Sequence, residues 1–85
     1  VISYPQVLFA ECYADYKAKK NEPLRLHYGI ARIDTSVCKD RDAAVLDLRA
    51  RLQTNGWILL KLMDFFEQEG LEERKENAGA YFLKY

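Results

Sequence analysis

The sequence predicts a small single α+β domain over residues 1–85, in which an antiparallel sheet packs against one main helix. Three observations carry this prediction. Residues 24–30 alternate with the period of a strand, residues 39–54 carry an apolar stripe with helical spacing, and a further apolar segment follows at 57–62. We expect the elements in the order strand, strand, helix, strand, strand (ββαββ), with a possible second short helix near 67–77.

Residues 5–20 begin the domain and fit two interpretations. As a helix they have Pro5 in the first turn and a stripe with i, i+3, i+4, i+7 spacing: Phe9, Cys12, Tyr13 and Tyr16. As a strand they place small and apolar residues on one face: Leu8, Ala10, Cys12, Ala14 and Tyr16. Aromatic residues favour a strand, whereas Ala, Glu and Lys favour a helix, so local signals leave both open.

The next segment is the clearest strand of the sequence. Its apolar residues alternate with polar or small ones and predict one buried face: Leu24, Leu26, Tyr28 and Ile30. His27 then belongs to the opposite, solvated face. If residues 5–20 are also a strand, the two form an antiparallel hairpin with Asn21 and Pro23 in its turn.

The main helix is predicted from its ends and its spacing. Asp40 is a suitable N-cap, and Asp47 and Arg51 are placed to pair across one turn. The buried stripe consists of Ala44, Val45, Leu48 and Leu52. Asn55-Gly56 supplies the left-handed conformation that ends many helices.

The segment 57–68 fits a strand or a second helix. Lys61, Asp64 and Gln68 have the spacing of a helical polar stripe, but acidic residues would lie at that helix's C-terminus, where the dipole disfavours them. We therefore predict that 57–62 is a strand in a buried sheet position with both faces covered. The polar stretch that follows is a loop or short helix, and AYFLKY (80–85) is predicted as a final edge strand.

Charge and cysteine content limit the function classes. The chain has 13 basic and 13 acidic residues, and this balance disfavours a dedicated nucleic-acid binder or a polybasic membrane anchor. No apolar run reaches the ~20 residues of a membrane span. Cys12 and Cys38 lack metal-site spacing, so we expect buried free thiols, a cytoplasmic location, and no metal or cofactor.

Candidate catalytic residues are few. His27 is the single histidine, and the sequence places no nucleophile or carboxylate beside it. Cys38 precedes a helix N-terminus, but the acidic residues that follow oppose a reactive thiolate. An alternative hypothesis is a small enzyme or ligand-binding domain whose site lies at a dimer interface and uses His27, Tyr28 or Cys38.

The favoured hypothesis is a non-enzymatic protein–protein interaction or regulatory module that forms a homodimer. Residues 17–25 contain four basic and one acidic residue, whereas 67–76 contain five acidic and two basic residues, so complementary patches could steer association. The candidate interaction surface comprises Lys17, Lys19, Lys20, Arg25, Tyr81, Phe82 and Leu83. A third hypothesis is a weak nucleic-acid binder that uses the lysines at 17, 19 and 20.

Overall fold

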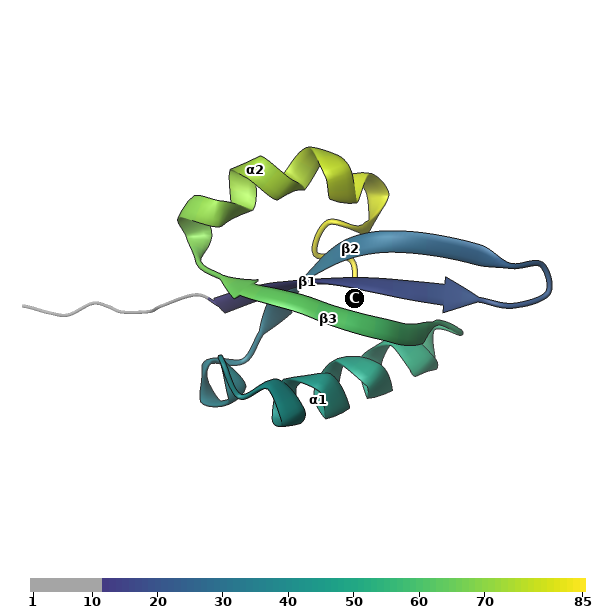
Figure 1. Cartoon of the computed structure of the whole chain (residues 1–85), viewed down its shortest axis with the longest axis horizontal. Coiled ribbons are helices and arrows are strands. Elements are labelled where there is room, and N and C mark those ends of the chain that lie inside the picture. The colour runs from purple at the N-terminus through teal and green to yellow at the C-terminus, as the bar shows by residue number, and fades with distance from the viewer. Residues whose placement is uncertain (1–11) are drawn as a thin grey trace, which may run out of the picture.

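The computed structural model describes residues 12–85 and forms a three-stranded antiparallel sheet between two helices (Figure 1). The elements are β1 (Cys12–Lys20), β2 (Arg25–Ile33), α1 (Arg41–Thr54), β3 (Ile58–Phe66) and α2 (Gln68–Ala78). The central strand is β1, in the order β2-β1-β3, and the helices cover opposite faces. The predicted α+β class and antiparallel sheet are confirmed, but the element order is ββαβα.

β1 settles the choice between helix and strand for the residues that the structure describes. Cys12, Ala14 and Tyr16 face α1, as the strand interpretation predicts, and Tyr13 lies on the opposite face. The first part of that segment, residues 5–11, lies outside the described residues.

α1 confirms the prediction made from local signals. The Asp40 side chain accepts a hydrogen bond from the Ala43 amide at 3.3 Å, and Asp47 pairs with Arg51 at 3.0 Å. Gly56 has φ +83°, a conformation that favours glycine, and it leads the chain directly into β3. The buried side of α1 consists of Ala44, Leu48 and Leu52.

β3 confirms the predicted strand and extends it to Phe66. Two register shifts interrupt its pairing with β1 and leave Leu60 and Met63 without direct partners, as in β-bulges. The Arg41 guanidinium donates hydrogen bonds to the carbonyls of Leu62 and Met63. The expectation that both faces of this segment are covered is wrong, because Leu60 is 50% exposed.

The predicted final strand is also wrong. Residues Gly79–Tyr81 form a 3-10 turn, and Phe82 makes a single isolated bridge with Ile30. Gly79 has φ +55° and turns the chain back towards β2 after α2 ends. The aromatic residues of this segment therefore fill the core on both sides of β2 instead of alternating along a strand.

A side chain of α1 and a backbone amide of the C-terminal segment bind two carbonyls of the β2 edge. The Arg51 guanidinium donates to the carbonyl of Arg32 at 3.1 Å, and the Leu83 amide donates to the carbonyl of Ile30 at 2.9 Å. Together with Arg41 at β3, these contacts satisfy backbone groups at both edges of the sheet.

A disulfide joins Cys12 to Cys38, so the prediction of two free thiols is wrong. Cys12 begins β1, and Cys38 follows the short turn Thr35–Val37 that precedes α1. Their Cα atoms are 6.0 Å apart although 26 positions separate them in sequence, because the β1–β2 hairpin returns the chain to its start. The cytoplasmic location was predicted in part from free thiols, and it stays a prediction.

Candidate functional site

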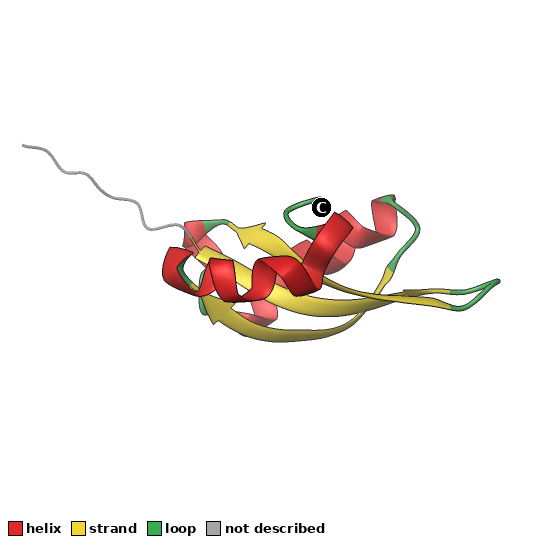
Figure 2. Ribbon diagram, turned by 90° about the horizontal axis from the view of Figure 1, so that it is seen from above, coloured by secondary structure: helices red, strands yellow, loops and turns green. Residues whose placement is uncertain are grey.

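Within residues 12–85, no helix covers about one half of the α2-side sheet face. α2 has 11 residues and so is about 16 Å long, whereas a strand of nine residues extends about 30 Å. Figures 1 and 2 show the β1–β2 hairpin reaching past the end of α2. We call this uncovered surface the open face. It consists of Lys17, Lys19, Leu26, Tyr28, Ile58, Leu60 and Lys61.

The strand register places cationic and apolar side chains side by side on the open face. Lys19 of β1 lies opposite Leu26 on one side and Ile58 on the other. One row further along, Lys17 lies between Tyr28 and Lys61. Because directly opposite residues of neighbouring strands point to the same face, Lys19 lies between two apolar side chains, whereas Lys17 and Lys61 are like charges side by side.

The apolar part of the open face is strongly solvent-exposed. Leu26 is 67% exposed and Ile58 is 44% exposed. The buried face predicted for residues 24–30 consisted of Leu24, Leu26, Tyr28 and Ile30. The prediction is wrong for the first two residues, which are exposed, and Ile30 is the one member of the four that is fully buried. Ile30 packs with Ala78 of α2, and Tyr28 packs partly against the same cluster, whereas Leu26 does not. The β1–β2 hairpin at the start of β2 reaches past the end of α2 (Figure 1).

A shallow hollow of about 310 Å³ lies within the open face. Lys17, Leu26 and Leu60 line it together with Tyr28. Its remaining lining comes from Ala18 and His27, whose side chains belong to the opposite face of the sheet. The hollow is thus a depression in the sheet surface with an apolar floor and a lysine at its margin.

A buried carboxylate holds Tyr28 at the margin of the open face. Asp15 accepts hydrogen bonds from the Tyr28 hydroxyl at 2.8 Å and from the Asp64 amide at 2.9 Å, and it pairs with Arg74 of α2 at 3.4 Å. Burial, and then the hydrogen bond to Asp15, raise the pKa of Tyr28 to about 12. The network ties all three strands and α2 together, and it fixes the Tyr28 ring in one position.

The basic residues predicted as an interaction surface are divided between the two faces of the sheet. Lys17 and Lys19 lie on the open face. Lys20 lies on the other face with its ammonium group 4.6 Å from the centre of the Trp57 ring, and Arg25 is its partner in the strand register. The three lysines proposed for nucleic-acid binding therefore do not form one continuous patch.

The predicted aromatic part of that surface lies away from the open face. Tyr81 stacks on His27 with ring centres 3.8 Å apart, and Phe82 packs into the core under α2. Both side chains are partly buried by the chain itself, whereas Leu83 is exposed. The structure thus does not bring these three residues together with Lys17 and Lys19.

Sequence reasoning missed the apolar half of the open face. Leu26, Ile58 and Leu60 were assigned to buried positions because each belongs to a regular apolar pattern. The spacing of Lys17 and Lys19 is the signal that could have revealed the open face. Residues two positions apart on a strand point to the same face, and the apolar residues of the neighbouring strands lie on this face too.

His27 is buried rather than solvated, so its predicted environment is wrong. Its Nε2 atom lies 2.9 Å from the Tyr16 hydroxyl, and the Trp57 ring meets it edge-on at 4.3 Å. Burial, and then the charge of Lys20, lower the pKa of His27 to about 4. Glycine is needed at Gly29, because a Cβ atom there would lie 2.5 Å from the Tyr16 hydroxyl.

The three residues of the enzyme hypothesis are not brought together. His27 lies on the α1-side face, whereas the Tyr28 hydroxyl is bound to Asp15 on the opposite face. Cys38 is held in the disulfide and has no free thiol. The Tyr16 hydroxyl is the hydrogen-bond partner of His27, and burial raises its pKa, which makes it a poor nucleophile at neutral pH.

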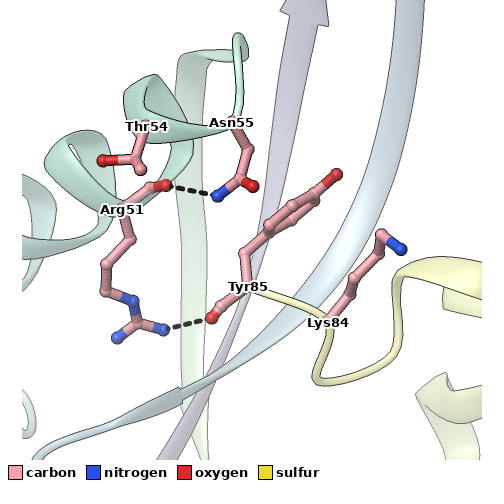
Figure 3. A pocket seen from close by; sticks show the side chains of 5 residues that line it. All are labelled: Arg51, Thr54, Asn55, Lys84 and Tyr85. Carbon is pink, nitrogen blue, oxygen red and sulfur yellow. Dashed lines mark hydrogen bonds between the residues drawn. The ribbon is translucent and has the colours of Figure 1, made fainter.

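A second hollow, of about 400 Å³, lies beside the last residues of the chain (Figure 3). Its polar groups bind one another. The Arg51 guanidinium donates to the carbonyl oxygen of Tyr85 at 3.0 Å, and the Asn55 side chain donates to the carbonyl of Arg51 at 3.0 Å. Thr54 and Lys84 complete the margin. These contacts anchor the segment after α2 to the end of α1.

Two further observations concern residues 12–85. In this range, no cluster of three or more His, Cys, Asp or Glu side chains is arranged to hold a metal ion. Within the same residues, neither α1 nor α2 has the length and apolarity needed to cross a bilayer.

Comparisons of the chain with protein-family models, with curated proteins and with solved structures found no match.

Proposed function

We propose that this protein is a non-enzymatic protein–protein interaction module whose contact surface is the open face. The observation that supports the proposal is the gathering of three exposed apolar side chains on one sheet surface: Leu26, Ile58 and Leu60. Lys19 of the central strand lies between Leu26 and Ile58. Contiguous apolar surface with a polar margin is typical of protein contact sites.

The expected affinity follows from the size of this surface. Burial of an exposed Leu or Ile contributes roughly 1.5–3 kcal/mol, so three such side chains contribute on the order of 5 kcal/mol before ordering costs. Micromolar binding requires about 8 kcal/mol, and the remainder must come from polar contacts. The open face therefore suits a transient partner that adds charged groups of its own.

The predicted homodimer would need a contact surface other than an edge strand formed by residues 80–85. Residues 80–85 are not a strand, so they cannot pair by strand addition across a two-fold axis. A symmetric dimer through the open face would bring Lys17, Lys19 and Lys61 of one copy close to the same lysines of the other. Self-association remains a prediction, and sedimentation at micromolar concentration tests it.

Site-specific photo-crosslinking tests the proposed contact surface. A benzophenone amino acid is placed at Leu26 or Leu60, and at Leu46 as a control, which is 63% exposed but lies on α1. In cells that produce the protein naturally, we expect the same adduct from both open-face positions and none from the control. Mass spectrometry then identifies the partner for binding measurements with purified proteins.

Variants of the same positions complete the test. Leu60→Ser is expected to weaken binding of the purified partner at least 10-fold, whereas Leu46→Ser leaves the affinity unchanged. Absence of adducts from both open-face positions, or equal labelling from the α1 position, would contradict the proposal.

A further inference from the structure

We infer that the partner bound by the open face is a short, acidic amphipathic helix of another protein. This inference rests on the proposed function and specifies its ligand. It is carried by the size of this surface, by its lysines, which have no salt-bridge partner within residues 12–85, and by the position of α2 beside it.

The uncovered surface has the dimensions of a short helix. Lys17 and Lys19 are two positions apart on β1, which is about 7 Å, and their side chains extend the surface to roughly 10 Å along the strands. Three strands give a similar width. A helix with side chains is about 10–12 Å in diameter, so two or three turns would cover the open face.

The charge of the open face requires an acidic partner. Lys17, Lys19 and Lys61 make no salt bridge with any residue in the range 12–85. In the strand register Lys19 lies between Leu26 and Ile58, whereas Lys17 lies directly opposite Lys61. A partner without acidic groups would desolvate these lysines and leave the like charges of Lys17 and Lys61 uncompensated. Glu or Asp residues flanking a stripe of Leu or Phe would pair with the lysines while the stripe fills the hollow.

The acidic helix that residues 12–85 of a second copy would present does not offer such a surface. α2 is this acidic element, but the exposed residues of that helix are polar and include Glu72, Glu73 and Glu76 without an exposed apolar stripe. The apolar residue Leu71 is partly buried and packs against the core cluster of Tyr13, Ile30 and Ala78. Docking of α2 on the open face of another copy would thus leave the apolar side chains unmatched.

The position of α2 also disfavours a lipid surface. α2 rises from the same side of the sheet as the open face, as Figure 1 shows. A flat bilayer would touch α2 before it reached the sheet, and residues 67–76 carry five acidic against two basic groups. Anionic lipid would be repelled there, whereas a helix-sized ligand fits beside α2 without this contact.

A designed peptide tests the inference directly. The probe is a helix-forming 14-residue peptide with Leu at i, i+3, i+4 and i+7 and Glu on both flanks. Its control carries Lys in place of every Glu. In an NMR titration of the whole chain, the acidic peptide is expected to shift the amide signals of Lys17, Leu26 and Leu60. Transferred nuclear Overhauser effects of the peptide should show that it is helical when bound.

Charge reversal supplies the matched variants. Lys17→Glu and Lys61→Glu are each expected to weaken binding of the acidic peptide at least 10-fold and to strengthen binding of the basic control. Lys84→Glu changes an exposed lysine away from the open face and is expected to leave both affinities unchanged. Raising the salt concentration should weaken the binding of the acidic peptide to the unmodified protein.

Four results would overturn the inference. These are failure of the acidic peptide to bind, equal binding of the two peptides, an extended bound peptide paired with β3, and tighter binding to vesicles rich in phosphatidylserine than to the peptide. If crosslinking from Leu26 and Leu60 yields a partner but the acidic peptide fails, the proposed function stands and only the helical, acidic ligand is rejected. Failure of crosslinking rejects the proposed function itself.

Discussion

Acidification is expected to destabilise the protein through its single histidine. His27 is 7% exposed and packs against the rings of Tyr81 and Trp57, with Tyr16 as the hydrogen-bond partner of Nε2. Its Nδ1 atom is buried and has no hydrogen-bond partner within the described part of the chain. A proton added there would create a buried cation that nothing nearby neutralises, and the ammonium group of Lys20 opposes it further.

The magnitude follows from the two pKa values. The pKa of His27 is about 4 in the folded protein against 6.5 for the free side chain. The unfolded chain therefore binds the proton more tightly, and the folded state is favoured fully above pH 6.5. As the pH falls towards 4 this contribution is lost, which lowers the free energy of unfolding by about 2 kcal/mol at pH 5 and about 3 kcal/mol at pH 4.

Urea denaturation at a series of pH values measures this loss. His27→Phe is the control, because it keeps a ring in the stack and removes the titrating group. Carboxylates titrate in the same range in both proteins, so the difference between the two stability curves isolates His27. A histidine NMR titration with a midpoint near 6.5, or parallel stability curves for the two proteins, would refute the assignment of His27 as a buried neutral side chain.

Two further predictions concern the carboxylate network and the disulfide. Asp15→Asn is expected to lower the free energy of unfolding by about 2–3 kcal/mol, because the amide keeps only one acceptor oxygen and removes the charge that strengthens the hydrogen bonds from Tyr28 and Asp64 and pairs with Arg74. In urea denaturation the exposed carboxylate variant Asp47→Asn should cost about 0.5 kcal/mol, and equal losses would contradict the buried role. Reduction of the bond between Cys12 and Cys38 should cost about 3 kcal/mol for a sequence separation of 26. Calorimetry with and without reductant measures it, and an unchanged melting temperature would contradict it.

The parts of the fold that the sequence predicted are those with local causes. α1 was predicted closely because Asp40 caps it, Asp47 and Arg51 pair across one turn, and Gly56 ends it. All of these signals involve residues at most a few positions apart. β3 was predicted less sharply, since an apolar run fits a buried helix or a strand equally well until its neighbours are known.

The parts that were wrong depend on contacts between distant segments. The disulfide requires the hairpin to return Cys38 to the start of β1, and nothing near either cysteine indicates this. The burial of His27 depends on Tyr81, which follows it by more than 50 positions. The open face exists because α2 is shorter than the strands beneath it, so Leu26 looks like a core residue in the sequence and is exposed in the structure.

Two arginines of α1 hinder pairing of sheet edges between molecules of this protein at high concentration. Arg41 occupies the carbonyls of Leu62 and Met63 on β3, and Arg51 occupies the carbonyl of Arg32 on β2, so a strand from another molecule would find these acceptors already bound. Growth of the sheet from chain to chain, as in fibrils, is hindered at these positions.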